Sequence, residues 1–166
     1  ELGAAAAAYN ADENELCRLD EIYSAVKTPF EIRSGSEKVT RRFFKICNNG
    51  QESFTGLYKN LTEQGICKGH QCIAYGLYMR DNGIELSEGL AVYGYSICSA
   101  IVTNCVKLVP LSQLAGQKIL GESFELISSA SEKALFTDIN DIGISGAGFD
   151  LRAMQHERLY SRQYMS

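Results

Sequence analysis

The sequence predicts an all-α protein, folded as a single-domain bundle of roughly seven helices. Three observations point to this fold class. Only 2 of the 166 residues are proline, so few positions interrupt a helix. Apolar residues recur at the i, i+3, i+4 spacing of a helix face, whereas the alternating pattern of strands is scarce. Hydrophobic residues make up 45% of the chain and charged residues 22%, which is typical of a globular domain.

The first half of the chain contains five predicted helices, which turn signals separate. They span residues 2–8, 14–26, 30–47, 53–64 and 70–79. Asp12 is placed to cap the second helix, in which apolar residues recur at helical spacing. Thr28-Pro29 separates the second helix from the third, because proline restricts the residue before it and suits a helix start. The Asn-Asn-Gly sequence at residues 48–50 ends the third helix.

The second half begins with a long helix, predicted over residues 84–109. Its uncharged run, residues 89–106, is long enough to span a membrane. Hydroxyl and amide groups in the run lower its transfer energy, so the sequence favours a fully buried central helix of the bundle. Pro110 starts the next helix, predicted over residues 110–136, and residues 140–148 (NDIGISGAG) form the longest Gly/Ser-rich loop.

The end of the chain has an unusual composition. We divide the chain into an all-helical domain, residues 1–149, and a C-terminal tail, residues 150–166, that begins with a turn or two of helix. Chain ends usually carry small polar residues, but this tail carries tyrosine, methionine and arginine. These residue types anchor protein–protein interfaces. The tail therefore either docks on a partner or folds back on its own core.

Composition argues against several classes of partner and site. The formal net charge is −4, and no basic block stands out, so nucleic acid is not an expected partner. No signal peptide is visible. The 6 cysteines lie mostly in apolar surroundings, which indicates small buried side chains in a reducing cytoplasm rather than a disulfide framework. We expect a cytoplasmic protein and no membrane partner.

Residues that could carry chemistry are few. Cys67, His70 and Cys72 are close in sequence and are soft or borderline metal ligands, but a fourth ligand is missing nearby, so a turn with incidental thiols is favoured. His156 beside Glu157 could act as a general base, yet no nucleophile accompanies it in a known motif. There is no phosphate-binding glycine loop. We therefore assign no catalytic, metal or cofactor-binding residue.

Three segments resemble the urease accessory protein UreF family. Residues 104–113 (NCVKLVPLSQ), followed by Gly116-Gln117-Lys118, resemble its "VPLxQxxGQ" stretch. The tail is similar to the C-terminus of Helicobacter-type members. Residues 29–33 (PFEIR), followed by Arg42-Phe43-Phe44, are similar to the family's "E-x-R" helix. The family's N-terminal Pro/Gly-rich segment and first helices have no counterpart before Glu1, so we expect a fragment, a trimmed chain or a divergent member.

The resemblance implies an all-helical scaffold rather than an enzyme. Family members are dimeric and act in nickel delivery to apo-urease. They bind the accessory protein UreD, called UreH in Helicobacter, and recruit the GTPase UreG, which handles the nickel and the GTP. We therefore expect UreD/UreH, UreG, apo-urease and a second copy of the chain as partners. The alternative is a helical protein-interaction domain unrelated to urease, and a metal-dependent enzyme comes third.

The resemblance also places the partner site on the tail. Four side chains are predicted to contact UreH, and four more are predicted to hold the tail in register. The contact residues are Tyr160, Arg162, Tyr164 and Met165, and the register residues are Gln155, His156, Glu157 and Arg158.

Overall fold

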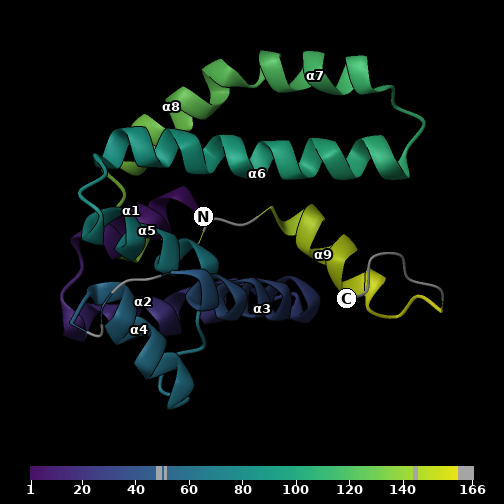
Figure 1. Cartoon of the computed structure of the whole chain (residues 1–166). Helices are drawn as coiled ribbons and strands as arrows, with labels where there is room; N and C mark the ends of the chain where they lie inside the picture. Colours follow the sequence, from purple (N-terminus) through teal and green to yellow (C-terminus); the bar gives the residue numbers. More distant parts are fainter. Residues whose placement is uncertain (48–49, 51, 144–145, 161–166) are drawn as a thin grey trace.

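The computed structural model describes residues 1–47, 50, 52–143 and 146–160. Within these residues the fold is all-α, as the sequence predicts, with nine α-helices, one short 3-10 helix and no strand. The elements are α1 (Leu2–Asn10), α2 (Glu13–Val26), α3 (Phe30–Ile46), α4 (Phe54–Glu63), α5 (Gln71–Asp81), α6 (Leu86–Leu108), α7 (Gln113–Glu122), α8 (Phe124–Ala134), η1 (Ile139–Asp141) and α9 (Ala147–His156). Figure 1 shows α7 and α8 running back along α6, with α1 to α5 forming the rest of the bundle.

The core lies where α1 packs against α5. Four of the five alanines of α1 are buried, and their small side chains let the two backbones approach closely. A Cβ added at Gly76 on α5 would lie 2.2 Å from the carbonyl oxygen of Ala5, which shows that only glycine fits at this crossing. Leu16, Leu19 and Tyr58 from the surrounding helices complete the core.

A buried carboxylate joins α2 to the segment between α4 and α5. Asp20 is 2% exposed. Its oxygens accept hydrogen bonds from the Tyr58 hydroxyl at 2.6 Å and from the backbone N–H groups of Lys68 at 2.7 Å and Gly69 at 3.1 Å. The Tyr58 hydroxyl in turn accepts the N–H of His70 at 2.7 Å. Since a buried charge needs such partners, this network fixes the turn at residues 64–70, here called the α4–α5 turn.

Three details of the sequence prediction are wrong. The helix predicted over residues 110–136 is two helices: Ser112 caps α7 by accepting the N–H of Ala115, and Ser123 separates α7 from α8. The loop predicted over residues 140–148 ends earlier, because α9 begins at Ala147 inside it, while the part of α9 that lies in the tail amounts to about two turns, as the sequence predicts. The roughly seven expected helices are therefore nine over the described ranges.

The third error concerns the long helix. Only its N-terminal half enters the core, through Gly89, Leu90, Tyr93 and Gly94. The rest of α6 extends with α7 beyond the α1–α5 core, whereas α8 returns to pack against α1 (Figure 1). Among the described helices, α6 is long and apolar enough to cross a membrane, a property that core helices of soluble proteins can share. The sequence correctly indicates an apolar helix, but most of α6 is not buried within this chain.

Candidate partner-binding site

The tail begins with α9, which lies beside α3 (Figure 1). At the end of α9, the Nδ1 atom of His156 lies 2.6 Å from Oε2 of Glu31, in the first turn of α3. The His156 side chain is 40% exposed and that of Glu31 is 27% exposed. The pair is therefore partly shielded from water, and the carboxylate of Glu31 makes the bond charge-assisted.

Glu157 makes a second contact with the same turn. Helix α3 starts after Pro29, whose side chain cannot cap the free N–H groups of the first turn. Oε1 of Glu157 accepts the N–H of Phe30 at 2.9 Å. Glu157 thus supplies the missing N-cap from the far end of the chain, and its negative charge also suits a helix N-terminus.

The turn that precedes α3 is held by Arg33. Its Nη1 donates to the carbonyl oxygens of Lys27 at 3.1 Å and Thr28 at 3.2 Å. The "E-x-R" segment therefore performs two structural tasks. Arg33 shapes the α2–α3 turn, and Glu31 binds the tail through His156.

The other predicted tail residues occupy different environments. The Gln155 side chain bonds to Arg152 on its own helix at 3.0 Å, and the Arg158 side chain is exposed. Tyr160 is fully exposed. Arg162, Tyr164 and Met165 lie outside the described residues. Of the four predicted register residues, His156 and Glu157 are therefore the two that bond to α3, and a partner contact by the tail stays a prediction.

The described tail thus both folds back and presents apolar groups. His156 and Glu157 fasten it to α3, while α9 has no buried residue. Large apolar side chains of this segment are exposed to solvent. They are Phe149, Leu151, Leu159 and Tyr160, here called the tail surface.

A second exposed apolar surface covers α6, α7 and α8. Its members, here called the arm surface, are Val92, Tyr95, Ile101, Leu108, Val109, Leu114, Ile119, Phe124 and Leu126. The rings of Tyr95 and Phe124 lie 6.0 Å apart between centroids, which joins the α6 and α8 parts of the surface. Large apolar side chains exposed on three packed helices are candidates for an interaction site. Sequence reasoning missed this surface because it assigned the whole of α6 to the core.

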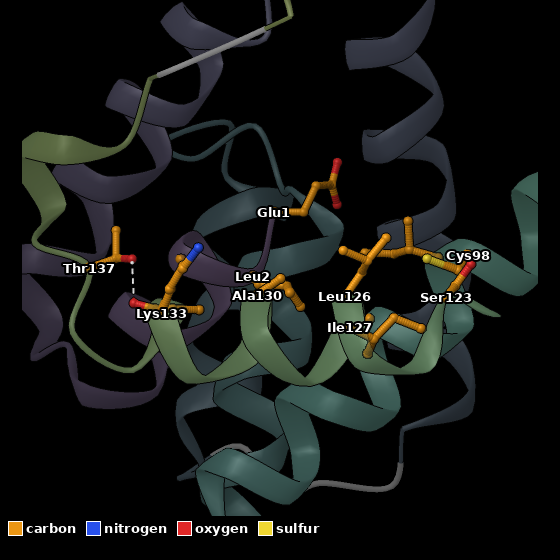
Figure 2. Close-up of a pocket in the computed structure, with 13 residues that line it drawn as sticks. Glu1, Leu2, Cys98, Ser123, Leu126, Ile127, Ala130, Lys133 and Thr137 are labelled. Atoms are coloured by element: carbon orange, nitrogen blue, oxygen red, sulfur yellow. Dashed lines mark hydrogen bonds between the residues drawn. The ribbon is translucent and has the colours of Figure 1, made fainter. Parts of the chain in front are cut away.

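A cavity of about 600 Å³ opens between α1, α6 and α8. Figure 2 shows Leu126, Ile127 and Ala130 of α8 among the residues that line it, together with Leu2 of α1 and Cys98 of α6. The wall is mostly apolar, and Glu1 and Lys133 are its charged residues. The cavity offers no set of convergent polar groups, so it is suited to apolar side chains rather than to a polar substrate.

The carboxylate of Glu1 interacts with a cation and with a hydroxyl group, and both stabilise its charged form. It forms an ion pair with Lys27 and accepts a hydrogen bond from the Tyr93 hydroxyl at 2.9 Å. Burial alone would raise its pKa, but the Lys27 charge and these hydrogen bonds outweigh that effect and lower the pKa to about 2. Lys27 also lies 5.1 Å from the ring centroid of Tyr23, so the cation is surrounded by favourable partners.

The side chains of Cys67, His70 and Cys72 are buried and packed within the domain. No group of three metal-ligating side chains occurs in the part of the chain that the structure describes. The Nε2 atom of His70 lies 2.7 Å from the Ser24 hydroxyl, and its ring packs edge-on against Tyr23. Burial lowers the pKa of His70 and raises that of the Cys72 thiol to about 12. Both groups are thereby kept neutral.

The family model and the similar proteins that match this chain all belong to one family. The family model of UreF matches residues 1–123. The urease accessory protein UreF of Actinobacillus pleuropneumoniae serotype 5b (strain L20) is 34% identical over 158 residues, which is 95% of this chain and 70% of the relative. The UreF of Haemophilus influenzae is 36% identical over 155 residues, or 92% of this chain and 66% of the relative. That of Paenarthrobacter aurescens (strain TC1) is 31% identical over 152 residues, or 89% and 67%.

Proposed function

Since this chain belongs to the UreF family of urease accessory proteins, we propose that it is a non-catalytic scaffold for nickel delivery to apo-urease. In this proposal it binds UreD, called UreH in Helicobacter, and the resulting complex recruits the GTPase UreG. Nickel and GTP are handled by UreG, so the chain needs no cofactor of its own. The observation that carries the proposal is the family match over most of the chain, together with a tail whose base is fastened and whose apolar residues are exposed.

The tail surface supports a role in binding UreD/UreH. Fixing the base of the tail reduces the conformational entropy that docking would otherwise cost. An exposed tyrosine next to this base is a typical anchor residue. Tyr160 is the described anchor, and we extend the same role to Arg162, Tyr164 and Met165.

The surroundings of the two histidines favour a scaffold over an acid–base enzyme. His70 is buried and bonded to Ser24, and His156 is bonded to Glu31. Among the residues that the structure describes, the Ser24 hydroxyl is the one nucleophile-type group bonded to either histidine, and it contacts a buried ring rather than an open polar cleft, as general acid–base catalysis would need.

The arm surface supports self-association. A homodimer through α6, α7 and α8 would remove these apolar side chains from water, and it explains why so long an apolar helix is so little buried in one chain. A cytoplasmic location fits free cysteines and a partner protein that uses GTP.

The proposal is tested by co-purifying this chain with its cognate UreH, and then adding UreG with GTP and nickel. We expect a three-protein complex. Tyr160→Ala and Arg162→Ala should each abolish UreH binding while the far-UV circular dichroism stays unchanged. Truncation at Asp150 should also abolish binding, and its circular dichroism should lose only the helical signal of α9. Phe136→Ala, which removes an 86% exposed ring outside the tail, is the matched control and should bind normally. Normal yield of UreH with all three tail variants would contradict the tail assignment, and no binding by the unaltered chain would contradict the scaffold role.

A further inference from the structure

Two cysteines from separate elements meet beside the buried Asp20. Cys17 lies on α2, and Cys67 lies in the α4–α5 turn. The Cys67 thiol donates a hydrogen bond to the sulfur of Cys17, with 3.8 Å between the Sγ atoms, although 50 positions separate the residues in sequence. Among the described residues, no other cysteine pair makes such a contact.

The backbone around this pair is held on both sides. Asp20, which follows Cys17 by one turn of α2, accepts the N–H groups of Lys68 and Gly69, next to Cys67. The N–H of Cys67 itself donates to the carbonyl of Leu61 at 3.2 Å. A disulfide requires the sulfurs to approach to about 2.05 Å. Because the α4–α5 turn is bonded to α2 through Asp20, the two sulfurs are held close together, at 3.8 Å, before any bond forms.

The two thiols differ in their access to solvent. Cys67 is 2% exposed, and burial together with the nearby Asp20 charge raises the pKa of its thiol. It therefore keeps its proton and is closed to large reagents. Cys17 is half-buried and is the member of the pair that a small oxidant can reach.

We propose that Cys17 and Cys67 are a peroxide-sensitive pair that closes to a reversible disulfide and clamps α2 to the α4–α5 turn. The Cys17 thiolate attacks one oxygen of hydrogen peroxide, the O–O bond breaks, and a sulfenic acid and hydroxide form. The hydroxide then combines with the proton that the Cys17 thiol had released, and this forms the first water. The sulfur of Cys67 then displaces the sulfenic hydroxyl, an S–S bond forms, and the Cys67 proton leaves with that hydroxyl as a second water. Two thiols are oxidised and one peroxide is reduced.

The remaining cysteines provide the contrast. Cys72 is fully buried, and burial also raises the pKa of Cys47. Cys98 and Cys105 are half-buried like Cys17, but neither makes a thiol–thiol contact among the described residues. A half-buried cysteine alone would stop at sulfenic acid or react further, whereas a paired one closes a disulfide.

The experiment treats the reduced chain with one equivalent of hydrogen peroxide, alkylates the remaining thiols and maps the peptides by mass spectrometry. We expect the 6 free thiols to fall to four, with a linked peptide that joins Cys17 to Cys67 and that dithiothreitol releases. The oxidised chain should melt several degrees higher, because the cross-link restricts the unfolded chain. Six intact thiols, a linkage between other cysteines, or an unchanged melting temperature would overturn the proposal.

Matched variants decide which cysteines react. Cys17→Ser alters a half-buried side chain, so it should fold normally and lose no thiol to a disulfide at the same peroxide dose. In Cys67→Ala the Cys17 sulfenic acid should persist and be trapped by dimedone. Cys98→Ser, the control, should still form the Cys17–Cys67 linkage. If Cys67→Ala does not fold, the Cys17→Ser variant alone tests the proposal. An intramolecular disulfide in Cys17→Ser would overturn it.

Discussion

The Nδ1 atom of His156 lies 2.6 Å from Oε2 of Glu31, a contact between residues 125 positions apart. It joins the end of α9 to the first turn of α3. Glu157 reinforces it by accepting the N–H of Phe30. The tail therefore leaves the domain from a defined point, and the exposed Tyr160 follows only a few residues later.

Removing the His156 contact should release the tail. In His156→Ala we expect the amides of α9 to exchange with solvent about tenfold faster, because losing a bond worth about 1.4 kcal/mol shifts local opening by that factor. Hydrogen exchange followed by mass spectrometry measures this. Gln155→Ala is the control, since the neighbouring side chain bonds within its own helix to Arg152. Equal exchange in both variants would show that the contact does not hold α9.

Glu157 should stabilise α3 as its N-cap. Glu157→Ala removes the acceptor for the Phe30 N–H and should cost about 1 kcal/mol, which corresponds to roughly 2–4 °C in melting temperature for a chain of this size. Differential scanning calorimetry measures the shift. Glu132→Ala, an exposed glutamate of α8, should change the melting temperature by less than half as much. A loss of equal size in the control would mean that charge, and not capping, is responsible.

Much of the fold was predictable because it depends on local signals. Asp12 caps α2 and Thr28-Pro29 precedes α3, as the sequence indicates. The break at Ser123 was not predictable from the apolar pattern, which continues through it. Ser112 could have been recognised as the cap of α7, since a serine before a helical pattern favours that role.

The candidate site was predictable only in part. The composition of the tail identified His156 and Glu157, but their partners Phe30 and Glu31 are more than 120 residues away, and periodicity carries no such long-range information. The arm surface was missed for a related reason. An apolar helix face has the same sequence pattern whether its own chain or another protein covers it.

Asp20 should be essential for stability. Asp20→Asn replaces one acceptor oxygen by an NH₂ group that faces buried donors from Tyr58, Lys68 and Gly69. We expect a loss of about 3 kcal/mol in the free energy of unfolding, measured by urea denaturation. Asp141→Asn, an exposed site, should be close to neutral. A loss below about 1 kcal/mol for Asp20→Asn would contradict the proposed network.

Glu1 should make stability depend on pH. Its pKa is lowered to about 2 from the ordinary 4.5, so the ionised form is favoured in the folded state. That stabilisation is complete above pH 4.5 and is lost as the pH falls through about 2. Because the side chain is 36% exposed, solvent screening reduces the contribution to about 1 kcal/mol. The melting temperature of Glu1→Gln should lie below that of the unaltered chain at pH 7, and the gap should shrink below pH 4.5. A gap that stays constant down to pH 3 would exclude this role.

The arm surface should mediate self-association. Tyr95 and Phe124 are 43% and 56% exposed, and their rings adjoin across α6 and α8. The double variant Tyr95→Ser/Phe124→Ser removes apolar area from the surface without opening the core. We expect the dimer dissociation constant to rise at least about tenfold, since each fully buried aromatic anchor contributes more than about 1 kcal/mol, while the melting temperature measured at low concentration stays the same. Sedimentation equilibrium measures the constant.

The control for this prediction is Ile46→Ser, which removes a 76% exposed apolar side chain at the end of α3, away from α6, α7 and α8. It should leave the dissociation constant unchanged, because the side chain lies outside the arm surface. An equal weakening by both variants would indicate non-specific apolar association. A chain that stays monomeric at all concentrations would contradict the homodimer.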